Sequence, residues 1–248
     1  MSRCAPQQSS VRRAAGGGDA SALAVNVLRA AGWWTADYTY AAYWQMHAIL
    51  SRPDASAFSQ GTKPPVLILP GIYESWRFML PLVEAVRALG YPIHTVEALR
   101  LNLRPVPEAA EVVREYIELH DLREVIIVAH SKGGLIGKHV MIHPDAGSRI
   151  DTMLAVATPF RGSVYSLFML TPSLRIFSPR NATIKALALK QEVNARIVSV
   201  YGRFDPHIPA TSELAGARNV ELPTGGHFRI LSDPRVLDEF VAMVGKRS

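Results

Sequence analysis

Residues 125–137, "VIIVAHSKGGLIG", carry the clearest signal of the fold in this sequence. The first five residues of this stretch are apolar without alternation, which is typical of a strand buried on both faces of a parallel sheet. Ser131 follows almost at once, between a histidine and a lysine, and two glycines come next. A strand that becomes a helix within one or two residues needs small neighbours, and Ala129 and Gly133 flank the serine on either side. We therefore expect Ser131 at the apex of a tight turn, at a helix N-terminus where the dipole favours negative charge.

Short apolar runs alternate with longer helical segments from residue 66 onward. The predicted strands are 66–69, 92–96, 125–129, 152–157, 196–201 and 219–222. The predicted helices between and after them are about 76–89, 107–120, 132–143, 183–190 and 234–244. This alternation predicts an α/β fold with a mostly parallel six-stranded sheet and helices on both faces. Because sites in such sheets form beyond the carboxyl ends of the strands, the residues that follow each strand matter most.

Three of those positions carry residues that can act together. Ser131 follows the third strand, Asp205 follows the fifth, and His227 follows the sixth after two glycines. Each could also be an ordinary cap, turn or structural residue. Their order along the chain is the stronger signal, because Ser, then Asp, then His is the order of one known triad of hydrolytic enzymes.

The pentapeptide A-H-S-K-G resembles the nucleophile elbow of α/β-hydrolases, G-x-S-x-G, with Ala129 in place of the first glycine. "LPGIYES" resembles their oxyanion-hole loop, with Pro70 in place of the usual histidine, and "VATPFRGS" (156–163) resembles a "TPHxGS" stretch of lipases, with Phe160 in place of its histidine. From Pro64 to Val244, the chain is similar to the bacterial lipase/esterase members of this superfamily.

The resemblance implies a role for each residue. Ser131 would attack an ester carbonyl, His227 would take and return the proton, and Asp205 would orient the imidazole. The backbone amides of Ile72 and Lys132 would bind the oxyanion, so the Lys132 side chain need not take part. This chemistry requires no cofactor and no metal.

The substrate is predicted from the apolar segment near 160–181, which stands where lipases often carry a lid or an acyl pocket. We expect Val164, Leu167 and Phe168 to contact an acyl chain, together with Phe160 and with Tyr73 of the oxyanion loop. Simple completion of the core explains these residues equally well. With the aromatic N-terminal helix, the segment favours hydrophobic carboxylic esters, including lipids.

The N-terminal part predicts a tail and a helix ahead of the catalytic domain. Residues 1–19 are expected to be disordered, 20–60 to form a helical extension and linker, and 61–248 to form the α/β-hydrolase domain. Gly32 could break the helix over 20–50. The aromatic residues of this helix could form one face; they are Trp33, Trp34, Tyr40, Tyr43 and Trp44. That face could pack on the body of the protein, dock on a membrane surface or line a lipid-binding cleft.

Composition narrows the class of protein. With 48% hydrophobic and 19% charged residues, the 248-residue chain has enough apolar sequence for a large core. Its net charge of +6 is scattered, which argues against nucleic acid as a partner and leaves peripheral membrane contact open. A single cysteine excludes an internal disulfide, and no segment reaches the roughly 18 apolar residues of a membrane span. We expect a cytoplasmic protein; its oligomeric state stays open.

These observations favour a serine carboxylester hydrolase. An acyltransferase or a thioesterase would use the same triad, and the sequence does not separate them. A non-catalytic protein of this fold that binds a ligand is the alternative from another class.

Overall fold

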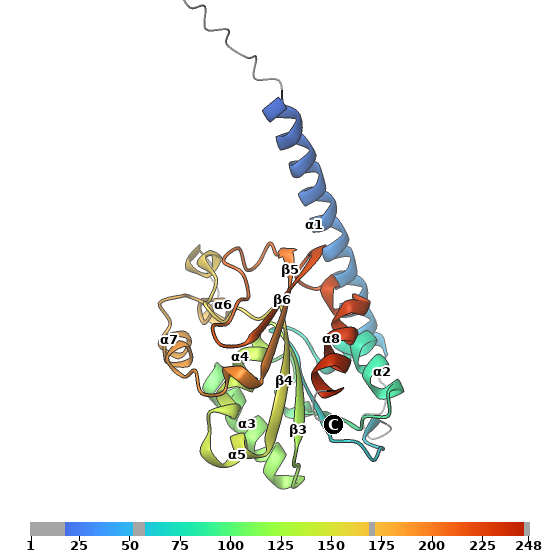
Figure 1. Ribbon diagram of the computed structural model, residues 1–248, viewed down its shortest axis with the longest axis vertical. Helices are drawn as coiled ribbons and strands as arrows, with labels where there is room; N and C mark the ends of the chain where they lie inside the picture. Colours follow the sequence, from blue (N-terminus) through green and yellow to red (C-terminus); the bar gives the residue numbers. More distant parts are fainter. Residues whose placement is uncertain (1–17, 52–57, 169–171, 246–248) are drawn as a thin grey trace, which may run out of the picture.

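The computed structural model describes residues 18–51, 58–168 and 172–245, and Figure 1 shows how their helices and strands are arranged. Six strands in this part of the chain form one sheet in the order β2-β1-β3-β4-β5-β6, and every neighbouring pair runs parallel. The strands are β1 (Val66–Leu69), β2 (Ile93–Thr95), β3 (Val125–His130), β4 (Ile150–Val156), β5 (Ile197–Phe204) and β6 (Arg218–Gly225). The predicted six-stranded α/β fold is confirmed.

Helices cover both faces of the sheet (Figure 1). One face carries α2 (Leu80–Ala88) and α8 (Pro234–Gly245). The other carries α3 (Val106–Leu119), α4 (Lys132–Met141), α5 (Pro144–Ser148) and α7 (Ala182–Leu189). Short 3₁₀ turns join the elements: η2 (Trp76–Met79), η3 (Glu97–Leu99), η4 (Val164–Phe168), η5 (Asn194–Arg196) and η6 (Arg229–Ser232).

The strands feed two separate cores because successive side chains of a strand point to opposite faces. In β3, Val125, Ile127 and Ala129 pack under α3 and α4, while Ile126 and Val128 pack under α2 and α8. All of them are fully buried, which explains why the sequence runs apolar without alternation.

The strand order reverses direction between β1 and β3. The chain passes from β1 to β2 at one edge and then returns to place β3 on the other side of β1. In open α/β sheets, the crevice at such a switch point is where ligands bind, beyond the carboxyl ends of the strands. The loops that follow β1 and β3 carry Ile72 and Ser131, so both lie at this point.

The N-terminal helix α1 (Gly18–Leu50) is continuous through Gly32, where the sequence left a break open. Its first turns project beyond the body and its last turns lie along the body beside η2 and η6 (Figure 1). The aromatic side chains do not share one face. Trp33, Tyr40 and Trp44 are half-buried, whereas Trp34 and Tyr43 are exposed.

The ends of the predicted segments are described only in part. Residues 1–17 of the predicted tail lie outside the described residues, and 18–19 already belong to α1. The predicted insertion near 160–181 contains η4 and the short helix α6 (Pro172–Arg175), and residues 169–171 between them lie outside the description. None of the described helices combines the length and the apolar character needed to span a bilayer.

Candidate active site

The turn between β3 and α4 is as sharp as the sequence suggests. Ser131 has φ 49° and ψ −117°, a region that non-glycine residues seldom adopt, and such strain clusters at functional sites. A Cβ atom on Gly133 would lie 2.0 Å from the backbone oxygen of Leu69 in β1. One on Gly134 would lie 2.0 Å from Oγ1 of Thr158. Only glycine therefore lets α4 start this close to the neighbouring strands.

Ser131, His227 and Asp205 meet at the carboxyl ends of their strands. His227 Nε2 lies 3.0 Å from Ser131 Oγ, and His227 Nδ1 lies 2.8 Å from Asp205 Oδ2. The other oxygen of Asp205 accepts hydrogen bonds from the amides of His207 at 2.7 Å and Ile208 at 3.0 Å. All three side chains of the Ser–His–Asp set are nearly inaccessible to solvent.

Charge around His227 favours its protonated form. Burial is the largest influence on the pKa of His227 and lowers it, but the Asp205 carboxylate next to Nδ1, together with the carboxylates of Glu74 and Asp37, raises the pKa above the ordinary value of 6.5. Burial, reinforced by the nearby His227, lowers the pKa of the neighbouring His207 to about 4. His207 is therefore neutral at pH 7 and adds no positive charge beside His227.

The loop after β1 carries one of the two amides predicted to bind the oxyanion, and the first turn of α4 carries the other. Neither the Ile72 amide nor the Lys132 amide donates a hydrogen bond to any part of the chain that the structure describes. Gly71, in the same loop as Ile72, donates its amide to Glu74 Oε2 at 2.7 Å. A Cβ on Gly71 would lie within 3 Å of that carboxylate, so the loop and the Glu74 side chain are closely packed.

Glu74 also pairs with His130, the histidine next to the serine in sequence. His130 Nδ1 lies 2.8 Å from Glu74 Oε2, and His130 Nε2 lies 3.0 Å from the backbone oxygen of His227. Because that carbonyl can only accept, Nε2 donates to it, and Nδ1 is left to face the carboxylate. This buried pair was not predicted; a glutamate in the loop after the first strand is its only sequence signal.

The Lys132 side chain has a structural role that its place in the sequence does not suggest. It is fully buried, and Nζ donates to the backbone oxygens of Asn102, at 2.6 Å, and Arg104. Asn102 donates its side-chain amide to the oxygen of Pro70 at 2.7 Å, and the Leu101 oxygen accepts from the Tyr73 amide at 2.8 Å. Lys132 thereby supports the segment that holds the loop around Ile72.

A cavity of about 570 Å³ opens over Ser131 and His227. Its apolar lining includes Ile72, Phe78, Leu174, Phe177, Ile208 and Phe228. One wall is helix α1, which contributes Tyr38, Ala41, Ala42 and Gln45. Gln45 donates to the Tyr73 oxygen at 3.1 Å, and Tyr38 Oη lies 3.1 Å from His207 Nε2. Within the described residues, no cluster of three or more His, Cys, Asp or Glu side chains is suited to a metal ion.

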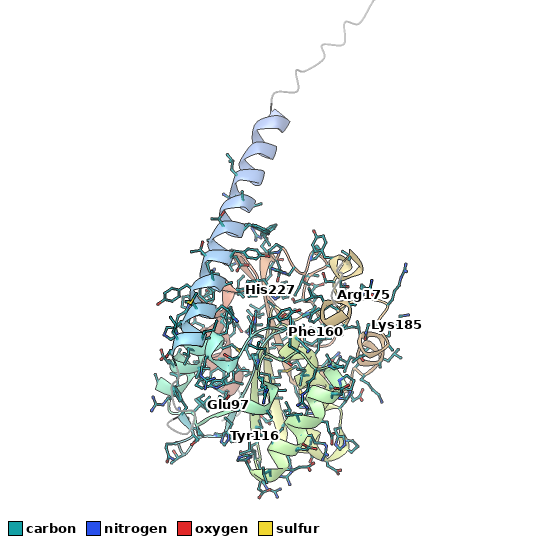
Figure 2. The ribbon with its side chains drawn as sticks, turned by 180° about the vertical axis from the view of Figure 1, so that it is seen from behind. Glu97, Tyr116, Phe160, Arg175, Lys185 and His227 are labelled. Atoms are coloured by element: carbon teal, nitrogen blue, oxygen red, sulfur yellow. The ribbon has the colours of Figure 1, made fainter. Side chains whose placement is uncertain are left out.

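The predicted substrate-binding residues divide into three groups. Tyr73 lines the cavity. Phe160 and Val164 do not line the cavity. Phe160, labelled with His227 in Figure 2, is buried in the core under α3 and α4. Val164 is 44% exposed at the start of η4. The side chains of Leu167 and Phe168 lie outside the described residues.

Other residues of the same segment line the cavity in place of Phe160 and Val164. They are Ser163, Tyr165, Ser166, Leu174 and Phe177. Which side of a short 3₁₀ turn faces a cavity depends on how the segment packs, and an apolar stretch without periodicity does not reveal it.

Known proteins share this fold at low sequence identity. Residues 104–211, less than half of the chain, match the family described as the PGAP1-like alpha/beta domain. No curated protein matches the chain in sequence. The mature lipase BlEst2 of Bacillus licheniformis has a TM-score of 0.56 and 17% identity, over 74% of this chain and 93% of that one.

Two further structures agree with this. The alpha/beta hydrolase domain-containing protein 10 from mouse has a TM-score of 0.55 and 13% identity, over 75% of this chain and 90% of that one. MGS-MChE2, an alpha/beta hydrolase enzyme from a lagoon-sediment metagenome, has a TM-score of 0.55 and 14% identity, over 76% and 93%. Identities this low establish a shared fold and no shared substrate. With its all-parallel sheet and the sharp turn after β3, the chain has the α/β-hydrolase fold that these structures share.

Proposed function

We propose that this protein is a serine carboxylester hydrolase that cleaves hydrophobic carboxylic esters through an acyl-enzyme intermediate. The observation that carries the proposal is the chain of hydrogen bonds from Ser131 Oγ through His227 to Asp205, with distances of 3.0 and 2.8 Å. It begins at the floor of a cavity with a largely apolar lining. A nucleophile, a base and a group that orients the base are the parts that acyl transfer needs.

The first half of the reaction forms the acyl-enzyme. His227 Nε2 takes the proton of Ser131 as Oγ attacks the ester carbonyl carbon, and the amides of Ile72 and Lys132 donate to the resulting oxyanion. Asp205 holds Nδ1–H and stabilises the imidazolium. The tetrahedral intermediate then collapses, its bond to the alcohol oxygen breaks, and His227 returns the proton to the leaving alcohol.

The second half repeats these steps with water. His227 removes a proton from a water molecule, which attacks the acyl carbonyl, and the acid leaves as Ser131 regains its proton. Each oxyanion donor contributes roughly 3–4 kcal/mol to the transition state in related chemistry. The protein groups complete this cycle without any oxidant or reductant.

The substrate we propose is an ester with an apolar acyl chain. Phe78, Leu174, Phe177 and Phe228 would enclose the chain, with Tyr73 near the reacting carbonyl. We propose that residues 61–248 are the catalytic domain and that the segment near 160–181, including Leu167 and Phe168, is its lid. Apolar lining with a few polar groups is typical of sites that bind such ligands.

The test is hydrolysis of p-nitrophenyl esters from acetate to laurate by the purified protein. We expect kcat/KM to rise with chain length beyond acetate, and Ser131→Ala to abolish turnover while its circular dichroism and Tm stay those of the parent. An inert parent protein on every chain length would contradict the proposal. A strict preference for acetate would contradict its hydrophobic substrate but not its chemistry.

The same intermediate serves an acyltransferase or a thioesterase. Adding an alcohol acceptor to the assay separates the first of these, because a transferase would form the new ester faster than the free acid. A matched pair of oxygen ester and thioester with one acyl chain separates the second. A folded protein that binds a fatty acid in the cavity but never turns over would favour the non-catalytic alternative.

A second proposal concerns the lipid surface. Tyr43, Met46, Ile49 and Leu50 in the last turns of α1 are each more than half exposed, and Tyr43, Met46 and Leu50 follow the spacing of one helix face. We propose that they contact an assembly of lipids. Flotation with phosphatidylcholine–phosphatidylglycerol vesicles tests this: Met46→Glu with Ile49→Glu should abolish binding, whereas the control Leu119→Glu, at a residue 82% exposed on α3, should not. Equal binding by all variants would exclude this surface.

A further inference from the structure

Helix α1 contains one acidic residue between positions 20 and 50, and that residue is fully buried. It is Asp37, which lies between the half-buried Ala36 and the exposed Tyr38. A buried carboxylate is costly unless hydrogen bonds satisfy it, so its partners indicate what it does.

Those partners are three consecutive backbone amides of the loop that carries His227. Asp37 Oδ2 accepts from the His227 amide at 2.9 Å. Its Oδ1 accepts from the amides of Phe228 and Arg229, both at 2.8 Å. These amides lead into η6, whose N-cap residue Phe228 provides no side-chain cap of its own. A carboxylate from a distant helix of the chain therefore caps the turn that follows His227.

Two glycines make this approach possible. Gly226 has φ +117°, and a Cβ there would lie 2.5 Å from Asp37 Oδ1. A Cβ on Gly225 would lie 2.4 Å from the indole of Trp33, which stacks on Phe204 with ring centroids 5.9 Å apart. The pair of glycines before His227 thus leaves the space in which α1 lies.

Both backbone hydrogen-bonding groups of His227 are held from outside its own loop. Asp37 accepts from its N–H, and His130 Nε2 donates to its C=O at 3.0 Å. The ring between them must reach Ser131 and Asp205 at once. A shift of about 1 Å in such a group can cost on the order of 100-fold in rate, so the points that fix its backbone bear directly on turnover.

We propose that Asp37 is a positioning residue of the active site, which holds the loop of His227 where the ring meets both Ser131 and Asp205. The expected effect on turnover rests on the proposed esterase function. The expected effect on the loop of His227 rests on the hydrogen bonds alone. Helix α1 would then hold the loop of His227 in place in addition to forming one wall of the cavity.

The charge of Asp37 adds an electrical effect to the mechanical one. Three carboxylates act on the side chain of His227, those of Asp205, Glu74 and Asp37. The rings of His130 and His207 also face it, and His207 in turn contacts the hydroxyl of Tyr38. Burial lowers the pKa of His227, and the three carboxylates raise it, Asp205 most strongly. Removing the charge of Asp37 should therefore lower the pKa of His227.

The experiment compares Asp37→Asn, Asp37→Glu and the control Thr39→Ala in the full chain. The Asp37→Asn change would turn an N–H group toward one of the donor amides, so we expect kcat to fall roughly 10–100-fold with KM little changed. The acid limb of the kcat/KM profile should move to lower pH. Asp37→Glu retains the charge and should keep that limb in place whatever its kcat. Thr39 is exposed and its hydroxyl donates to the Thr35 oxygen of its own helix, so its variant should match the parent.

A second readout does not depend on turnover. Hydrogen–deuterium exchange of the amides of residues 227–229 should speed up in Asp37→Asn and stay unchanged in Thr39→Ala. A folded Asp37→Asn with parental kcat, acid limb and exchange would overturn the positioning role. If the parent protein were inert but exchange and the titration of His227 changed as stated, the esterase function would fail and the positioning role would stand.

Discussion

Replacing Asp205 by asparagine keeps the shape of the side chain and exchanges one acceptor for a donor. In the parent, Oδ1 accepts from the amides of His207 and Ile208, and Oδ2 faces His227 Nδ1 at 2.8 Å. These two backbone amides will hold the carbonyl oxygen of the new side chain, because the opposite orientation leaves both of them facing an N–H at about 1–3 kcal/mol each. The NH₂ group must therefore point at His227.

That orientation forces the wrong tautomer on the base. Nδ1 of His227 has to accept a hydrogen bond from the NH₂ group of the substituted side chain, so the ring hydrogen moves to Nε2, which faces Ser131 Oγ at 3.0 Å. An Nε2 that already carries hydrogen cannot take the serine proton. The same exchange in serine proteases lowers kcat about 10⁴-fold, which corresponds to about 5 kcal/mol of transition-state stabilisation.

The assay is kcat/KM for p-nitrophenyl octanoate at pH 8, with Glu221→Gln as the matched control. Glu221 is an acidic residue of β6 that pairs with Arg203 at 3.2 Å, both side chains being about half exposed or more. Such a pair contributes about 0–1 kcal/mol to stability, so Glu221→Gln should be almost silent. Equal losses in the two variants, or a folded Asp205→Asn with parental activity, would mean that Asp205 does not orient His227.

Three further predictions concern the pKa values of His227 and Lys132 and the packing of Gly133. Because the base must be neutral and the pKa of His227 is raised, kcat/KM should increase with pH through a midpoint above the ordinary imidazole value of 6.5; a midpoint below that value would contradict the assignment. Burial lowers the pKa of Lys132 from 10.5 to about 8, so between these pH values the unfolded chain binds one proton more than the folded chain. The unfolding free energy of the parent, measured relative to that of Lys132→Met, should therefore rise by up to about 3 kcal/mol across this pH window. A difference that does not change with pH would contradict the lowered pKa of this buried lysine. Gly133→Ala places a Cβ against the Leu69 oxygen, so its unfolding free energy in urea should be about 3 kcal/mol or more below that of the parent. Gly32→Ala has nothing within 4 Å of its Cβ, so its unfolding free energy should be up to about 1 kcal/mol higher. Equal stability of the two variants would contradict the packing described for α4.

The sheet and the positions of the key residues were predictable because the signals for them are local. Each buried strand is a short apolar run, and a parallel sheet brings the residues that follow its strands to one edge. Ser131, Asp205 and His227 were found in this way, and the structure brings them together. Their catalytic role stays a prediction until it is measured.

The supporting contacts were not predictable because each joins distant segments. Asp37 reads as one polar residue of an aromatic helix, and its three amide partners lie 190 or more positions away. The sequence pointed to Lys132 only for its backbone amide, yet its Nζ is buried against the backbone of Asn102. Only the packed fold reveals such partners, because propensity and periodicity describe one segment at a time.

The side of a segment that faces the cavity was likewise beyond the sequence. The apolar residues Phe160 and Val164 were expected to line the site because they lie in the right insertion. Phe160 instead completes the core, and Val164 faces outward beside Tyr165, which lines the cavity. The described part of the insertion holds one 3₁₀ turn, η4, and the four-residue helix α6, which are too short to show a period from which an inner face could be inferred.

The proposed chemistry requires Ser131 to be a nucleophile that His227 activates. Incubation with a fluorophosphonate probe, followed by intact-mass and peptide mass spectrometry, tests it most directly, since the probe reacts with an activated serine. We expect one adduct per chain, on the peptide that contains Ser131, and none in Ser131→Ala or His227→Ala. A folded parent protein that gains no adduct, or one that is labelled equally in Ser131→Ala, would contradict it.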